Sequence, residues 1–160
     1  MVMIEEILQD GLFAAIAAIG FAAISRPPRR AYAWCALIAA VGHSVRFILM
    51  NAAGANIIPA TLVASFIVGT MAVFISPHAK FPAETCLFPA LLPMIPGIYA
   101  YKAFGGLALC MFSGNEAMFS HNFYLFAFNA VTSAAILLCM VTGANLPIFI
   151  FKKISFQATR

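Results

Sequence analysis

The chain has 160 residues, of which 64% are apolar and only 9% are charged. Soluble domains carry roughly 25% charged residues, so this composition leaves too little polar surface to cover a water-soluble fold. Disorder is excluded as well, because disordered chains are poor in apolar residues and rich in charge. The remaining class is a compact membrane protein. Since a membrane-spanning helix needs about 20 apolar residues, the length allows at most about six spans in a single domain, residues 1–160, without a separate soluble catalytic domain.

The net charge of +4 comes from nine Lys or Arg and five Asp or Glu. A basic chain can bind nucleic acid, but these bases adjoin apolar segments. Membrane topology explains them better, so no nucleic-acid partner is expected. The cysteines lack the close spacing of zinc sites and disulfide frameworks, so neither a metal nor a cofactor is predicted. The four cysteines are Cys35, Cys86, Cys110 and Cys139.

The first span is predicted over residues 11–25, after an acidic start that contains Glu5, Glu6 and Asp10. This start has no basic leader and no cleavage site of small residues, so we expect it to be kept in the mature protein. The segment from Arg26 to Arg30 ends the span, because its prolines cannot continue a helix and its arginines stay in water.

Two further spans are predicted over residues 31–50 and 57–75, joined by a short turn from Asn51 to Asn56. The third span is predicted to end at Ser76-Pro77, because proline lacks the N–H that the next helical turn needs. The last span is predicted over residues 117–142. Beyond it, we expect Gly143 and Pro147 to loosen the helix end, with Lys152 and Lys153 as anchors in water.

The fourth span, residues 82–111, is predicted to be broken. Three prolines and a glycine fall within nine residues, Pro89 to Gly97, and each proline removes one backbone hydrogen bond. We expect a first half up to Leu92, a break over Pro93–Gly97, and a second half ending near Met111. Backbone exposed within a bilayer is tolerated only where it is buried in protein or lines a cavity. The alternative is a kink that only shapes the packing.

A second half-helix that begins near Gly97 would present free N–H groups and the positive end of its dipole. Transporters use such helix ends to hold anionic substrates. Tyr101 follows one turn later and is placed to donate to the same ligand. The predicted fold is therefore an all-α polytopic membrane protein with five transmembrane helices, the fourth broken at a Pro-x-x-Pro-Gly segment.

Five spans place the two termini on opposite sides of the membrane. On one side lie seven bases, against Lys102 alone on the other, so the positive-inside rule predicts a periplasmic N-terminus and a cytoplasmic C-terminus. The seven bases are Arg26, Arg29, Arg30, Lys80, Lys152, Lys153 and Arg160.

Small residues recur every four positions in the first three spans, a spacing that lets helices approach closely. These stripes predict either internal packing or contact with another subunit. The stripes are Ala14, Ala18 and Ala22, then Ala36, Ala40 and Ser44, then Ser65 and Gly69.

His43 and Arg46 lie on one face of the second span, and an ionisable residue within a span indicates a functional site by default. Arg46 can hold a carboxylate with two parallel hydrogen bonds, or it can extend to the interface near Met50. His43 can titrate near neutral pH, or it can make an ordinary hydrogen bond between helices. Asp10 is expected at a span end, as are Glu84 and Glu116, so any transported proton would need His43 or a partner chain.

Asn122 and Asn129 share a face of the last span with Ser133. Their amides need partners in lipid, so they predict either hydrogen bonds between helices or the lining of a cavity. The sequence contains no nucleophile–base pair, phosphate-binding loop or dinucleotide fingerprint, and no enzyme is predicted.

The sequence resembles the small, YjjB-type subunit of the threonine/serine exporter (ThrE) family over nearly its whole length. The Pro-x-x-Pro-Gly block carries most of this resemblance. The matching residues are Trp34-Cys35-Ala36-Leu37, Gly42-His43, Arg46, Ile48-Leu49-Met50, Ala64-Ser65, Val68-Gly69-Thr70, Pro93-Met94-Ile95-Pro96-Gly97-Ile98 and Tyr101.

The resemblance implies an exporter in the bacterial inner membrane. Fused members join two five-span halves in one chain, whereas split members separate a larger YjjP-type subunit from a small one. It therefore implies a larger membrane partner for this chain. A split pair resembles a succinate exporter, and fused members resemble threonine and serine exporters. This chain lacks the soluble hydrolase-like segment of the fused members.

We therefore expect a subunit of a heteromeric exporter, with succinate as the first cargo and a hydroxy amino acid as the second. Homo-oligomerisation stays open, and a non-transporting accessory subunit is the alternative from another class. The substrate-binding residues are predicted from the residues themselves, because the resemblance gives none. They are His43, Arg46, Pro93, Pro96, Gly97, Tyr101, Asn122 and Asn129.

Overall fold

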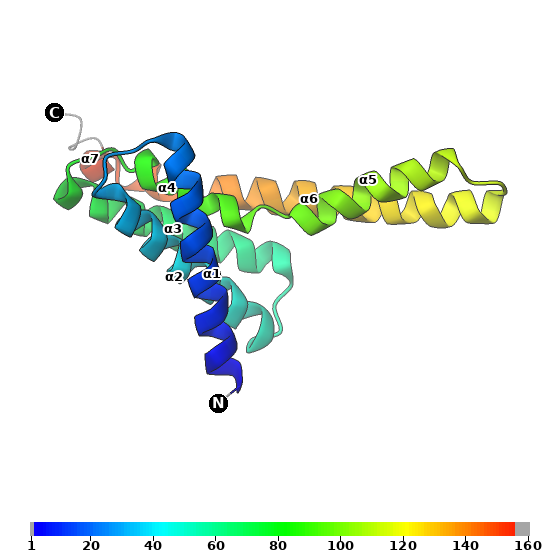
Figure 1. Cartoon of the computed structure of the whole chain (residues 1–160), viewed down its shortest axis with the longest axis horizontal. Helices are drawn as coiled ribbons and strands as arrows, with labels where there is room; N and C mark the ends of the chain where they lie inside the picture. Colours follow the sequence, from blue (N-terminus) through cyan, green and yellow to red (C-terminus); the bar gives the residue numbers. More distant parts are fainter. Residues whose placement is uncertain (1, 156–160) are drawn as a thin grey trace. The chain divides into compact units, whose positions relative to one another are not determined.

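The computed structural model describes residues 2–155, and over that range the chain is helical and contains no strand (Figure 1). Met1 and residues 156–160 lie outside the described residues, and with them Arg160, one of the seven bases of the topology prediction. The helices are α1 (Val2–Ser25), α2 (Ala31–Asn51), α3 (Ile57–Ala79), α4 (Glu84–Leu91), the 3-10 helix η1 (Leu92–Met94), α5 (Gly97–Met111), α6 (Glu116–Ile150) and α7 (Lys152–Ser155).

Four helices, α1, α2, α3 and α6, are long and apolar enough to cross a membrane. A fifth span results when the bent pair formed by Glu84–Met94 and Gly97–Met111 is counted as one. The predicted all-α polytopic fold with a broken fourth span is thereby confirmed. The extents of the spans within a bilayer, and the single transmembrane domain, stay predictions.

The break lies where the prolines predict it. Helix α4 passes into η1 and ends at Met94, and α5 begins at Gly97. Pro96 has φ −76° and ψ 58°, outside the helical region, and the Gly97 N–H bonds to the Ile95 carbonyl at 2.8 Å. The chain therefore closes a tight turn here in place of a regular helical turn.

Two helices continue through prolines at which the sequence predicts a helix end or a loosened one. Helix α3 continues through Pro77 to Ala79 and ends at Lys80, whose backbone is left-handed at φ 55°. The Ser76 hydroxyl, one residue before the proline, donates to the Phe81 carbonyl at 2.7 Å, and this hydrogen bond is buried. One missing backbone hydrogen bond therefore does not end a helix that its surroundings hold.

Helix α6 likewise continues through Gly143 and Pro147 to Ile150. A Cβ on Gly143 would lie 2.6 Å from the Leu62 carbonyl of α3. The glycine therefore lets two helix backbones touch, and it does not loosen the helix end as predicted. In the same crossing of α3 and α6, Gly69 of α3 lies against the backbone of Ala144.

The chain divides into two compact units, one reaching to Met94 and including Cys139 onward, the other being Ile95–Leu138. In the first unit, the small-residue stripes face neighbouring helices within the chain. Ala14, Ala18 and Ala22 are buried, and a Cβ on Gly11 of α1 would lie 2.8 Å from Ser44 Oγ of α2. The stripes therefore serve internal packing, which is one of their two predicted roles.

The cysteines of the first unit also join two helices. The Cys35 thiol of α2 lies 3.9 Å from the Thr85 carbonyl, and the Cys86 thiol of α4 lies 3.7 Å from the Ala31 carbonyl. Helices α2 and α4 therefore exchange two thiol–carbonyl contacts. All four cysteines are free.

The second unit is a hairpin of α5 and the first part of α6 (Figure 1). A Cβ on Gly106 would lie 2.7 Å from the Phe126 nitrogen, so the two backbones pack closely at this point. In the connecting loop, the Asn115 side chain caps α6 by accepting from the Met118 N–H at 2.8 Å.

Candidate functional site

A polar cluster joins α1, α2 and η1 inside the first unit. The His43 Nδ1 atom lies 3.1 Å from Asp10 Oδ2, and the Arg46 guanidinium donates to the Met94 carbonyl at 3.1 Å. These four groups are named here the Asp10–Met94 cluster. All three side chains lie in helices that are long and apolar enough to cross a membrane. Ionisable side chains at such positions are rare and indicate function by default.

Asp10 was not among the predicted site residues. The sequence was interpreted with the first span starting at residue 11, so Asp10 fell at a span end, whereas α1 begins at Val2 and Asp10 lies within it. A signal was present: Asp10 precedes Ala14 by four residues and therefore extends the Ala14–Ala18–Ala22 stripe by one turn. Since that stripe is buried, the spacing places Asp10 beside α2.

Arg46 binds the carbonyl that ends η1. The end of a helix carries partial negative charge, and the break removes the regular backbone partners there, so a cation is well placed at this carbonyl. Of the two roles considered for Arg46, the hydrogen bond to Met94 does not support extension to the interface, because it directs the guanidinium toward the helix break. Its further N–H donors remain available for a ligand.

His43 has one ring nitrogen on Asp10 and one without a partner. The His43 side chain is 9% exposed and that of Asp10 is 36% exposed. Among the described residues, Nε2 of His43 is the buried side-chain nitrogen or oxygen that has no hydrogen-bond partner. Buried polar atoms are rarely left unpaired, and an unpaired one indicates strain, function or an absent ligand.

Most of the other predicted ligands lie in the second unit. The Gly97 N–H is occupied by the Ile95 carbonyl, Pro96 is buried, and the Tyr101 side chain is 80% exposed. Asn122 donates to Ser113 Oγ at 3.1 Å, and Asn129 donates to the Leu125 carbonyl in its own helix at 2.6 Å. The structure thus places His43, Arg46 and Pro93 in the first unit and the remaining five predicted residues in the second.

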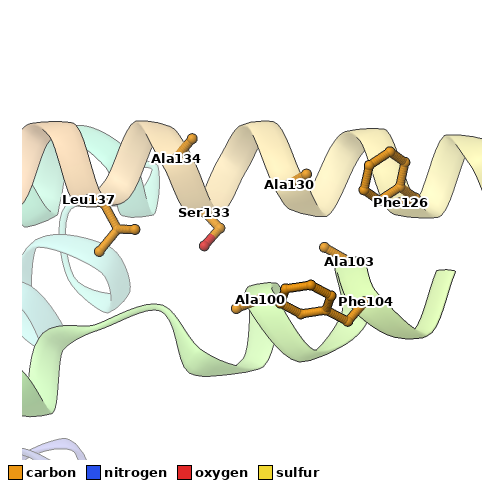
Figure 2. A pocket seen from close by; sticks show the side chains of 8 residues that line it. All are labelled: Ala100, Ala103, Phe104, Phe126, Ala130, Ser133, Ala134 and Leu137. Carbon is orange, nitrogen blue, oxygen red and sulfur yellow. The ribbon is translucent and has the colours of Figure 1, made fainter. Parts of the chain in front are cut away.

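A pocket of about 260 Å³ lies between α5 and α6 in the second unit (Figure 2). Its walls are apolar except at Ser133, whose hydroxyl points into it. Neither asparagine of the predicted face lines it. The lining residues are Ala100, Ala103, Phe104, Phe126, Ala130, Ser133, Ala134 and Leu137. Such a pocket suits an apolar group and offers no charge to a carboxylate.

Within residues 2–155, no group of three His, Cys, Asp or Glu side chains is arranged to hold a metal ion. The chemistry that the Asp10–Met94 cluster offers is therefore hydrogen bonding, ion pairing and proton exchange. A guanidinium, an imidazole and a carboxylate together can bind a small polar ligand or a proton.

Comparison with known proteins places the chain in a family. A family described as "Threonine/Serine exporter, ThrE" matches residues 10–150. An uncharacterized protein of Haemophilus influenzae is 33% identical over 147 residues, which make up 91% of this chain and 48% of that protein. The chain thus spans about half the length of this curated relative, and no solved structure matches it significantly. Since the match covers most of the sequence, the chain belongs to the threonine/serine exporter (ThrE) family, a family of membrane transporters.

Proposed function

We propose that this chain is one subunit of a heteromeric exporter of small carboxylates, with succinate as the first cargo and threonine or serine as the second. All three cargos carry a carboxylate, the group that Arg46 suits best. The observation that carries the proposal is the guanidinium held at a broken helix within a polar cluster that lies among candidate spans. Broken helices with charged groups beside them are how secondary transporters build binding sites.

The cargo site would use the residues around the break. Arg46 would bind a carboxylate through the N–H groups that Met94 leaves free, and protonated His43 would donate a further hydrogen bond. Pro93 would keep the backbone of the first unit open beside Arg46. In the second unit, Pro96 would keep the backbone open, and Gly97, Tyr101, Asn122 and Asn129 are proposed as cargo contacts of that unit.

A partner subunit is part of the proposal. The chain matches 48% of its relative, so the relative has room for a second segment of similar size. An odd number of spans would place two such halves in opposite orientations, which is how inverted repeats enclose a site at mid-membrane. We propose a larger YjjP-type chain as the second half, and a second copy of this chain is the alternative.

We further propose that the chain lies in the bacterial inner membrane, with its N-terminus in the periplasm and its C-terminus in the cytoplasm. The exposed bases Arg26, Arg29 and Arg30 between α1 and α2 support this orientation. Lys102, in α5, is the one base on the proposed periplasmic side.

A non-transporting accessory subunit is the second candidate. It is favoured by the internal partners of Asp10 and Arg46 and by the apolar pocket in the second unit. In that case the polar cluster would only fasten α1, α2 and η1 together.

Inverted membrane vesicles test both candidates. Vesicles would contain this chain alone, the larger chain alone, or both, and uptake of labelled succinate and labelled threonine would be measured. The proposal expects uptake only with both chains and a marked preference for one cargo. Full uptake with the larger chain alone would leave this chain an accessory role, and no uptake of either cargo by any vesicle would contradict the exporter.

A further inference from the structure

The contact that His43 Nδ1 makes determines whether the unpartnered Nε2 atom carries a hydrogen or a lone pair. A carboxylate only accepts hydrogen bonds, so the contact between His43 Nδ1 and Asp10 Oδ2 requires the proton on Nδ1. In a neutral ring, Nε2 then carries a lone pair and no hydrogen. This nitrogen is buried without a donor to satisfy it.

Few charged groups surround this imidazole. From α1 it faces Asp10, and from its own helix Arg46 lies one turn away. Helix η1 contributes the Met94 carbonyl, which Arg46 occupies. The next titratable residue along α1 is Glu6, which is exposed, and His78 of α3 and Glu84 of α4 are exposed near helix ends. Cys86 of α4 is buried, with its thiol at the Ala31 carbonyl.

We propose that His43 Nε2 is the proton-binding atom of the exporter, with Asp10 as its positioning residue. This inference rests on the proposed function. A proton on Nε2 makes the ring an imidazolium that keeps its contact with the Asp10 carboxylate, whose negative charge favours the bound proton. The charge that this proton adds lies one turn along α2 from Arg46 and changes the electrostatic energy of its guanidinium. Protonation therefore affects the hydrogen bond between Arg46 and the Met94 carbonyl at the helix break.

The step conserves every atom. One proton enters from the periplasmic side and forms an N–H bond at Nε2, and Nδ1 keeps its own proton on the Asp10 carboxylate. When the site opens to the cytoplasm, the Nε2–H bond breaks and the same proton leaves. No bond of the cargo changes, and one proton crosses the membrane for each cycle in exchange for cargo.

His43→Asn tests this atom directly. The asparagine amide nitrogen can occupy the place of Nδ1 and still donate to Asp10, but the side chain cannot take up a proton. The control is His78→Asn, the same change at an exposed histidine whose ring nitrogen contacts the Phe74 carbonyl. Inverted vesicles with both subunits would be assayed for cargo accumulation driven by an acid interior, and for cargo exchange without a pH gradient.

We expect His43→Asn to lose accumulation driven by the gradient and to retain a weakened exchange, because the ring also donates to the cargo, while His78→Asn keeps both. Asp10→Asn should keep exchange and shift the pH dependence of driven accumulation to lower pH by about one unit, because the proton loses a countercharge. Accumulation by His43→Asn at the wild-type level would overturn the proposal. So would complete loss of exchange in this variant, since His43 would then be required for cargo binding or folding and not specifically for the proton.

Wild-type vesicles separate this inference from the proposed function. If wild-type vesicles exchange neither succinate nor threonine, the exporter itself is contradicted, whatever the variants do. If wild-type vesicles exchange cargo but a pH gradient of either sign leaves accumulation unchanged, the exporter stands and the proton site is overturned.

Discussion

Arg46 lies near the end of α2, yet its guanidinium is held by a carbonyl 48 residues further along the chain. Its position near Met50 makes extension to the interface a natural expectation from sequence. The outcome depends on the break, because only a helix that ends within the bundle offers a carbonyl to bind. The residue type and its spacing from His43 indicated a functional role for Arg46. Its partner, the Met94 carbonyl, lies beside it only because of how the helices pack.

Arg46→Ala is expected to abolish transport while both subunits still assemble. The change removes a hydrogen bond from a charged donor, an interaction that typically contributes about 1.5–3 kcal/mol, and leaves the Met94 carbonyl without this partner. Arg30→Ala, at an exposed arginine outside the helices, is the control. Transport by vesicles and thermal unfolding in detergent are the measurements. Wild-type transport by Arg46→Ala would remove this residue from the site.

Asp10 shows what residue-by-residue interpretation misses. Its charge placed it outside the predicted span, although its spacing placed it on the buried face of that span. The pairing with His43 explains why Asp10 lies within the helix, because a carboxylate inside a helical bundle is tolerated when a hydrogen-bonding partner is present. That partner lies 33 residues away in the chain, and no local pattern identifies it.

Some prolines of this chain interrupt a helix, whereas others lie inside one. The break at Pro93–Gly97 was predicted correctly, because several helix-breaking residues there act within two turns. Pro77 was interpreted as a helix end and Pro147 as a residue that loosens one, and both lie inside helices. A single proline removes one hydrogen bond, and helix packing over many residues outweighs that loss.

Replacing Pro93 and Pro96 together with alanine is expected to restore a regular helix across the break. Each proline in a helix costs about 3 kcal/mol relative to alanine, so the variant should unfold at a higher temperature, or at least no lower. Transport should nevertheless fall, because the open backbone is lost. Thermal unfolding and vesicle transport measure the two effects. Unaltered transport would mean that the break only shapes the packing, and Pro28→Ala in an exposed loop serves as control.

The hairpin of the second unit offers a matched pair of neighbouring glycines. A Cβ on Gly106 would lie 2.7 Å from the Phe126 nitrogen, whereas one on Gly105 would meet nothing within 4 Å. Gly106→Ala should therefore separate α5 from α6 and destabilise the protein by about 1–3 kcal/mol. Gly105→Ala should leave stability unchanged or raise it slightly, because alanine favours a helix.

Unfolding of both variants by heat or denaturant in detergent checks this expectation. Equal stability of the two would show that α5 and α6 do not approach closely at Gly106.

At the scale of the whole molecule, composition alone predicted a helical membrane protein, and the number and order of its helices followed from hydropathy and breakers. The candidate site was less predictable, because its residues come from α1, α2 and η1 and meet only through packing. The chain also matches about half the length of its relative. The proposed path would be completed by a second half, which sequence patterns within this chain do not describe.

If the helix break lines a path that water and cargo reach from outside the bilayer, side chains beside the break are accessible to water-soluble reagents. The most direct measurement is labelling of Ile98→Cys, at a position that is 70% exposed in the first turn of α5, by a water-soluble maleimide. The four native cysteines would be replaced, both subunits would be present, and Val131→Cys on α6, 69% exposed, would serve as the comparison. We predict that Ile98→Cys is labelled, that cargo slows the labelling, and that Val131→Cys stays unlabelled in lipid. An Ile98→Cys protein as unreactive as Val131→Cys, with or without cargo, would contradict the claim.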